Sequence, residues 1–221
     1  MRPTALRRCL TWLALPRRSG PIDDDWGFSR GTPIDRWYIE RFLSAHATDI
    51  RGDVLEVRDD RYTRRFGSGI RTSTVLDVDP ANPDATLVGD LEQPGSLPTE
   101  RYDCIVLTQT LHYVFDVRAA VEAVHQALKP GGVCLATIPV ISRLDWAARD
   151  TGEHWRITPH GATRLFGDRF GAEHSTITAH GNTRTAVAFL LGLPAEDLAP
   201  RELSTDEPLF PVVVTVHATK A

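Results

Sequence analysis

Cysteine is scarce, and the few cysteines present form no pattern in which they would act together. Of 221 residues only three are cysteine, Cys9, Cys104 and Cys134. Because no CxxC pair or Cys/His cluster occurs, the sequence predicts neither a disulfide framework nor a metal site. Cys104 and Cys134 lie in apolar, strand-like runs, which predicts buried free thiols. Free thiols fit a reducing compartment, so we expect the protein to be cytoplasmic.

The sequence also lacks a long apolar run and an excess of positive charge. No run is long enough to span a bilayer, and the short apolar stretch at 9–15 has arginine pairs on both sides and no small-x-small cleavage site. The net charge of −4 gives no general electrostatic reason to bind nucleic acid. We therefore expect neither a membrane nor a nucleic acid as partner. The N-terminal arginines are interpreted as solvated surface, which leaves contact with a membrane or an anionic partner open as the alternative.

Ordinary amounts of apolar and charged residues, 42% and 24%, indicate a globular chain with enough material for one sizeable domain. The segment 20–32 is rich in Gly, Pro, Ser and Asp, which is typical of a loop. We therefore expect an N-terminal arm and loop over 1–32 and a single domain over 33–221. The sequence does not fix the oligomeric state, and a homodimer is one option left open.

Short apolar runs separated by helical patterns predict an α/β fold. Continuous apolar runs of this length are typical of parallel strands that are buried on both faces. The expected strands are 54–57, 72–78, 85–88, 104–107, 133–138, 173–179 and 210–216. Apolar spacing and capping residues predict helices that begin near Pro33, after Asp116 and after Thr158, and a further helix over 183–191. The looser C-terminal part predicts that the last strands reverse direction.

One segment carries a specific resemblance. Residues 102–139 read YDCIVLTQTLHYVFDVRAAVEAVHQALKPGGVCLATIP: a strand that opens with Tyr-Asp, a polar loop, an Asp-led helix, a Lys-Pro-Gly-Gly turn and a new strand. This segment closely resembles class I S-adenosylmethionine-dependent methyltransferases. The stretches GTPIDRWYIERFL, DVLEV, YTRRFG, NPDATLVGDL and HWRIT look like a bacterial group of methyltransferase-domain proteins associated with sugar or natural-product biosynthesis.

The resemblance implies a Rossmann-like, mostly parallel seven-stranded sheet with helices on both faces. It implies the strand order 3-2-1-4-5-7-6, with strand seven antiparallel, and S-adenosylmethionine as cofactor across the carboxyl ends of strands one, two and four. Ligands of open α/β sheets bind at this edge, where neighbouring loops diverge. On the same resemblance, the cofactor-binding residues are Glu56, Asp79, Asp90, Leu91, Thr108 and Gln109.

Each of these residues has an expected role and a plainer alternative. Glu56 ends strand one, where the family's acidic residue orders the loop and reaches the methionine ammonium; a surface salt bridge is the alternative. Asp79 would bind the ribose hydroxyls, and Asp77, on the same face, could replace it. Asp90 would approach the adenine amino group and Leu91 would cover the adenine, unless 89–90 is only a turn. Thr108 and Gln109 would line the floor beneath the sulfonium.

The sequence departs from the family where the family has a glycine-rich loop. After Glu56 it reads Val57-Arg58-Asp59-Asp60-Arg61-Tyr62, with no glycine before Gly67. Since glycine allows the backbone to approach a ligand closely, larger residues must displace either the ligand or the loop. The connection between strands two and three is also too short for a crossover helix.

Two histidines are candidate general bases, and four residues are candidates for binding the acceptor. His112 follows the strand-four floor, with a surface histidine at a helix start as alternative. His154 lies after strand five and could be oriented by Glu153, although adjacent residues usually point apart. Trp155 and Trp146 could stack on an acceptor or simply fill core. Arg36 and Tyr38 on the first helix, and Arg156, would complete the acceptor site, while an Arg36–Glu40 surface pair is the alternative for Arg36.

The sequence therefore predicts a cytoplasmic methyltransferase that acts at oxygen or nitrogen of a small molecule. The missing glycines favour one alternative, a non-catalytic methyltransferase-like binding or scaffold protein. A non-methylating enzyme on the same fold is a second alternative, because a fold alone does not determine chemistry.

Overall fold

The computed structural model describes residues 19–145 and 152–221, so Cys9, Trp146 and the N-terminal arginine cluster lie outside the described residues. The chain forms two compact units. Unit 1 consists of Met1–Glu40, Val140–Arg143 and Ala179–Val213, and unit 2 of Arg41–Pro139, Leu144–Thr178 and Val214–Ala221. The expected single domain over 33–221 stays a prediction.

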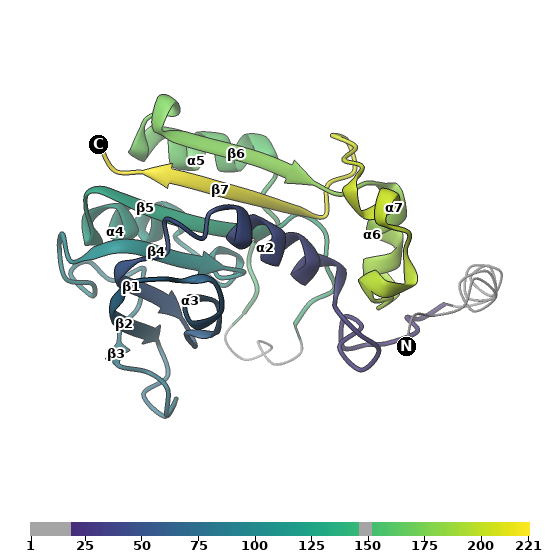
Figure 1. Ribbon diagram of the computed structural model, residues 1–221, viewed down its shortest axis with the longest axis horizontal. Coiled ribbons are helices and arrows are strands. Elements are labelled where there is room, and N and C mark those ends of the chain that lie inside the picture. Colours follow the sequence, from purple (N-terminus) through teal and green to yellow (C-terminus); the bar gives the residue numbers. More distant parts are fainter. Residues whose placement is uncertain (1–18, 146–151) are drawn as a thin grey trace. The chain divides into compact units, whose positions relative to one another are not determined.

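The strands form one seven-stranded sheet in the order β3-β2-β1-β4-β5-β7-β6, which confirms the predicted order (Figure 1). Apolar, β-branched runs produce these strands, and the inner ones are buried along most of their length. The strands are β1 (Gly52–Val57), β2 (Ile70–Asp77), β3 (Leu87–Val88), β4 (Tyr102–Thr108), β5 (Leu128–Pro139), β6 (Ser175–His180) and β7 (Val213–Thr219).

Strands β1 to β5 pair in parallel, and β7 runs antiparallel to its neighbours. Leu55 lies between Thr74 of β2 and Ile105 of β4 in the parallel register. The amide of Gly131, near the start of β5, donates to the carbonyl of Lys220 beyond the end of β7. The predicted reversal is therefore confirmed for β7. We call the ends of β1, β2 and β4 the carboxyl edge and their starts the amino edge.

Helices begin where capping residues precede apolar spacing. Asp116 accepts hydrogen bonds from the amides of Arg118 and Ala119, and Thr158 accepts one from Gly161, so both predicted N-caps are confirmed. The α-helices are α2 (Ile34–Ala45), α3 (Arg61–Phe66), α4 (Val117–Ala127), α5 (Pro159–Phe170), α6 (Thr183–Leu190) and α7 (Pro200–Ser204). Short 3-10 helices are η2 (Leu111–Tyr113), η4 (Ala172–His174) and η5 (Ala195–Asp197).

Helices α3 and α7 are absent from the sequence prediction. The α3 segment reads RYTRRF, which gives too few apolar positions for a periodic signal. Its arginines pair locally: Arg61 with Asp59, and Arg64 with Asp60 at helical spacing. No helix interrupts the connection from β2 to β3, as its length predicts. In the part of the chain that the structure describes, no helix has the length and apolar character to cross a membrane.

The core of unit 2 is built on β1, β4 and β5, and it contains both predicted buried thiols. Cys104 and Cys134 are free and have no solvent exposure. Burial raises the pKa of Cys104 well above its usual value and that of Cys134 to about 12. Both thiols therefore stay protonated at neutral pH and act as small apolar side chains.

Unit 1 has its own apolar cluster, in which residues of α2 pack with residues of α6 and of the segment that follows it. Ile34 and Tyr38 are buried with Phe189 and Leu193. An isolated bridge pairs Pro33 with Pro194. These contacts hold the N-terminal end of α2 in unit 1.

Candidate functional site

Glu56 is a buried carboxylate near the end of β1, with an exposure of 2%. It accepts hydrogen bonds from the amides of Tyr62 and Thr63 and from the Thr63 hydroxyl, at 2.8–3.1 Å. These bonds tie the loop after β1 and the start of α3 to the strand, which is the loop-ordering role that the resemblance implies. Burial outweighs them and raises the pKa of Glu56 to about 7.

The loop after β1 has a glycine-like backbone although it contains no glycine. Arg58, two residues after Glu56, has φ +75°, in the left-handed region that favours glycine. Its amide donates to the carbonyl of Leu76 at 2.8 Å, and its carbonyl accepts from the Asn82 side chain. Hydrogen bonds to β2 and to the turn after it therefore hold a left-handed residue in this loop.

At the end of β2, Asp77 and Asp79 differ in their hydrogen-bond partners. The Asp77 carboxylate accepts hydrogen bonds from the Asn82 side chain at 2.6 Å and from the Asp79 amide at 3.0 Å. Asp79 is exposed and accepts from the Ala81 amide within its own turn. Through Asn82, the end of β2 is linked to the Arg58 loop.

Asp90 and Leu91 follow β3. The Asp90 carboxylate accepts from the Glu92 amide at 2.9 Å, and its carbonyl accepts from the Ser96 hydroxyl. Asp90 therefore takes part in the turn that the plainer alternative predicts, while Leu91 is buried. Their roles toward adenine stay predictions.

Gln109, directly after β4, carries an unsatisfied polar group. Its backbone has φ +48°, and its amide donates to the carbonyl of Thr137 at 2.9 Å. The side-chain Nε2 is buried and has no hydrogen-bond partner among the described residues. Thr108, the last residue of β4, is half-buried and its carbonyl accepts from Thr110. A buried donor without a partner is costly, so it marks the carboxyl edge as a place where a ligand can bind.

His112 and Glu153 come together beside this edge. His112 lies in η2 with an exposure of only 4%, so the alternative of a surface histidine is wrong. Its Nε2 lies 3.5 Å from a Glu153 carboxylate oxygen, which also accepts from Arg156 at 2.7 Å. The other Glu153 oxygen accepts from the Asp145 amide at 2.7 Å. The Glu153 carboxylate is therefore held in place between two cations or potential cations.

Glu153 does not orient His154, as one hypothesis from the sequence had it. Adjacent side chains diverge here: Glu153 faces His112, whereas His154 is exposed and its ring meets Phe115 edge-on at 5.3 Å. Trp155, 41% exposed, lies 5.9 Å from the Phe115 ring and donates from Nε1 to the Phe115 carbonyl. Phe115 is itself 65% exposed, and the sequence analysis did not single it out. The three rings form an exposed aromatic group, which we call the aromatic patch.

The predicted acceptor residues Arg36 and Tyr38 lie in the part of α2 that belongs to unit 1. Tyr38 is buried in the apolar cluster of that unit, where its ring stacks on His180 at 5.7 Å. The Arg36 amide donates to the Asp35 carboxylate. Tyr38 thus has a core role within unit 1, and acceptor binding by both residues stays a prediction.

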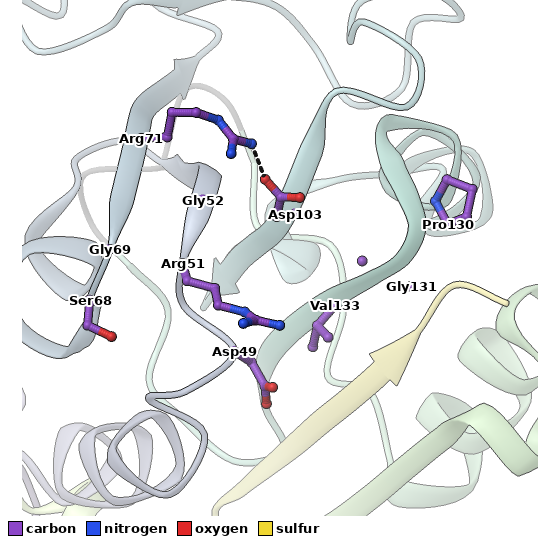
Figure 2. A pocket seen from close by; sticks show the side chains of 11 residues that line it. Asp49, Arg51, Gly52, Ser68, Gly69, Arg71, Asp103, Pro130, Gly131 and Val133 are labelled. Carbon is purple, nitrogen blue, oxygen red and sulfur yellow. Dashed lines mark hydrogen bonds and ion pairs between the residues drawn. The ribbon is translucent and has the colours of Figure 1, made fainter.

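An open pocket of about 720 Å³ lies at the opposite, amino edge of the sheet. Figure 2 shows Arg71 pointing to Asp103 across the starts of β2 and β4, with Arg51 and Asp49 on another wall. The pocket is far from the residues that the resemblance selects, because the length of the parallel strands separates the amino edge of the sheet from the carboxyl edge. Its size alone does not make it the reaction site, and two of its charged residues, Arg71 and Asp103, pair with each other.

Comparisons with known proteins agree with the fold. Residues 35–134 match a family described as a methyltransferase domain. The methyltransferase in complex with the Haloferax volcanii Trm112 methyltransferase activator is 18% identical, with 85% of this chain and 92% of that chain covered and a TM-score of 0.56. An S-adenosylmethionine-dependent methyltransferase from Mesorhizobium loti is 18% identical, with coverages of 85% and 98% and a TM-score of 0.52.

The N-methyltransferase NodS from Bradyrhizobium japonicum, in complex with S-adenosylhomocysteine, is 15% identical, with coverages of 90% and 94% and a TM-score of 0.52. No curated protein matches the chain. At these identities the solved structures establish the fold, and the family match covers α2 to the first part of β5.

Proposed function

We propose that the chain is a member of the class I S-adenosylmethionine-dependent methyltransferase superfamily and that it methylates a hydroxyl or amine of a small molecule. The predicted fold is confirmed. The match of residues 35–134 to a methyltransferase domain supports the proposed superfamily, enzyme class and cofactor. The acceptor and the residues that bind and react are proposals. A cytoplasmic location and a place in bacterial biosynthesis belong to the same proposal.

The residues at the carboxyl edge fit the cofactor in two respects. The Arg58 backbone has the left-handed conformation that favours glycine, and the buried Gln109 Nε2 lacks a partner among the described residues. The second observation carries the proposal, because the cofactor carboxylate would satisfy this donor. We assign cofactor binding to Glu56, Asp79, Asp90, Leu91, Thr108 and Gln109, with Glu56 acting mainly through the loop that it holds. Asp77 joins this group as the alternative ribose ligand.

The cofactor, when bound, supplies a methyl group already activated on a sulfonium, so the protein mainly has to orient the acceptor and remove a proton. His112 is the better candidate for the general base. Its Nε2 faces Glu153, which stabilises the imidazolium that forms when His112 takes the proton from the acceptor. Arg156 fixes the carboxylate from the other side. His154 is exposed and has no such partner at Glu153.

The aromatic patch is the proposed acceptor surface. Phe115 and Trp155 present exposed rings close to the His112–Glu153 pair, since Phe115 follows η2 and Trp155 follows Glu153. Such rings stack on aromatic compounds and on the apolar faces of sugars. This favours a small acceptor with a flat apolar face and a hydroxyl or amine beside it.

A scaffold function is the second candidate, and one observation favours it. Arg58, Asp59 and Asp60 place charged side chains where the superfamily usually has glycine, and Arg61 and Arg64 pair with two of them. If these side chains fill the cofactor space, the fold serves only as a binding module.

Calorimetry with S-adenosylmethionine distinguishes these functions. We expect wild-type protein to bind one equivalent, and Asp79→Ala and Asp77→Ala to show which carboxylate contacts the ribose. Thr183→Ala, in α6 of unit 1, is the control that should leave binding unchanged. Absence of binding would favour the scaffold. Binding without methyl transfer across a broad panel of hydroxyl and amine acceptors would favour a non-methylating enzyme.

A further inference from the structure

Three possible metal ligands meet on the side of unit 2 that faces away from the proposed reaction site. His46 follows the end of α2, Asp49 lies in the turn before β1, and His217 is in β7. One donor atom from each residue lies within 4.8 Å of the other two. An Asp49 oxygen is 3.4 Å from His46 Nδ1 and 3.1 Å from His217 Nε2.

The two separations from the Asp49 oxygen fit ligands of a tetrahedral ion. Ligand atoms about 2.1 Å from a tetrahedral zinc ion are about 3.4 Å from each other, from simple geometry. The two imidazoles also lie close together, with ring centroids 4.6 Å apart. A shared cation satisfies both lone pairs and the carboxylate at once.

The local fold holds the three side chains in place. The Asp49 amide donates to the His46 carbonyl at 3.0 Å, which closes the turn between them. The His46 ring also packs on Phe42 at 4.9 Å. His217 is fixed in a strand of the sheet.

We propose that His46, Asp49 and His217 bind a divalent transition-metal ion, with Zn²⁺ as the best match. Two imidazoles and one carboxylate suit Zn²⁺ and its neighbours, whereas Mg²⁺ and Ca²⁺ prefer oxygen ligands throughout. Three protein ligands leave a position for water or another ligand. The three side chains are 24–34% exposed, so an ion can enter, and Asp49 also lines the amino-edge pocket (Figure 2).

The test is metal binding by the full chain without a histidine tag. Co²⁺ serves as a spectroscopic probe, followed by displacement with Zn²⁺ in calorimetry. We expect one equivalent per chain, visible absorption bands typical of a four- or five-coordinate ion, and a Zn²⁺-dependent increase in Tm. His46→Gln, Asp49→Asn and His217→Gln should each weaken Zn²⁺ binding by more than about 100-fold.

The matched control is His174→Gln, because His174 is an exposed histidine that also lies beside a carboxylate, Glu173. It should bind Zn²⁺ like the wild type. The Tm without metal checks that each variant is folded. The proposal is overturned if wild-type protein binds no ion, or if folded ligand variants bind as tightly as the control. Neither result bears on methyl transfer, because the experiment measures no activity and no S-adenosylmethionine binding.

Discussion

Two carboxylates three residues apart on β1 show how differently the two edges of the sheet are built. Asp53, at the amino edge, accepts from Arg71, Lys129 and Thr72, and these hydrogen bonds hold its pKa far below the usual range. Glu56, near the carboxyl edge, accepts from backbone amides and one hydroxyl, and burial raises its pKa to about 7.

Asp53 contributes a fixed charge to the stability of the fold, whereas Glu56 has a pKa close to neutral pH. At the amino edge, cations surround a carboxylate that stays ionised at any ordinary pH. At the carboxyl edge, an amide donor lacks a partner, a carboxylate titrates near neutrality and a non-glycine residue has a left-handed backbone. Such costly features concentrate at functional sites.

The largest expected effect is the loss of methyl transfer when the carboxyl edge is changed. His112→Ala should lower kcat by about 10²–10⁴-fold, the usual contribution of a general base. Glu153→Gln should cause a smaller loss and shift the pH profile, because Glu153 acts through His112. Steady-state kinetics with an acceptor identified from the panel measures both.

Asp53→Asn is the matched change at the amino edge. It should lower the Tm, because its cationic partners lose their charged acceptor, while kcat stays that of the wild type. Equal loss of activity from the changes at both edges would remove the functional distinction between them.

The next largest effect is on the pH dependence of stability. The unfolded pKa of Glu56 is near 4.5 and the folded pKa is about 7, so the folded protein keeps a proton that the unfolded chain has released. Stability from this group is present below pH 4.5 and is lost as the pH rises to about 7, amounting to about 3 kcal/mol. Urea unfolding between pH 5 and pH 8 should show this fall in wild type and not in Glu56→Gln. Equal pH dependence in both proteins would contradict the raised pKa.

Gln109→Ala should change binding and stability in opposite directions. Losing one hydrogen bond to a charged ligand weakens S-adenosylmethionine binding by about tenfold, or about 1.4 kcal/mol. Removing a buried donor without a partner stabilises the ligand-free protein by up to about 1 kcal/mol. Calorimetry and urea unfolding measure the two effects. Weaker binding together with lower stability would indicate a structural role instead.

The sequence predicts the strands, their order and two helix caps because these follow from local apolar patterns and from a specific 102–139 segment. It does not predict α3, whose apolar face is too small, or the partner of Glu153, which depends on how two loops approach each other. His46 and His217 are 171 positions apart in the chain, so no spacing rule brings them together. The sequence predicts that the site lies at the carboxyl edge of the sheet. It does not predict the contacts between the side chains of the site, because these depend on the fold.

The smallest expected effect concerns the backbone at Arg58. A non-glycine residue in the left-handed region costs about 1–2 kcal/mol of stability, and substitution by glycine removes this cost. Part of the gain is lost again because glycine has greater conformational freedom in the unfolded chain. Arg58→Gly should therefore raise stability by up to about 1 kcal/mol and preserve or improve cofactor affinity. Asp59→Gly, at a neighbouring position without a positive φ, should lower stability. If Arg58→Gly destabilises the protein as much as Asp59→Gly does, residue 58 does not have a left-handed backbone. The carboxyl edge then lacks one of the features that distinguish it from the amino edge.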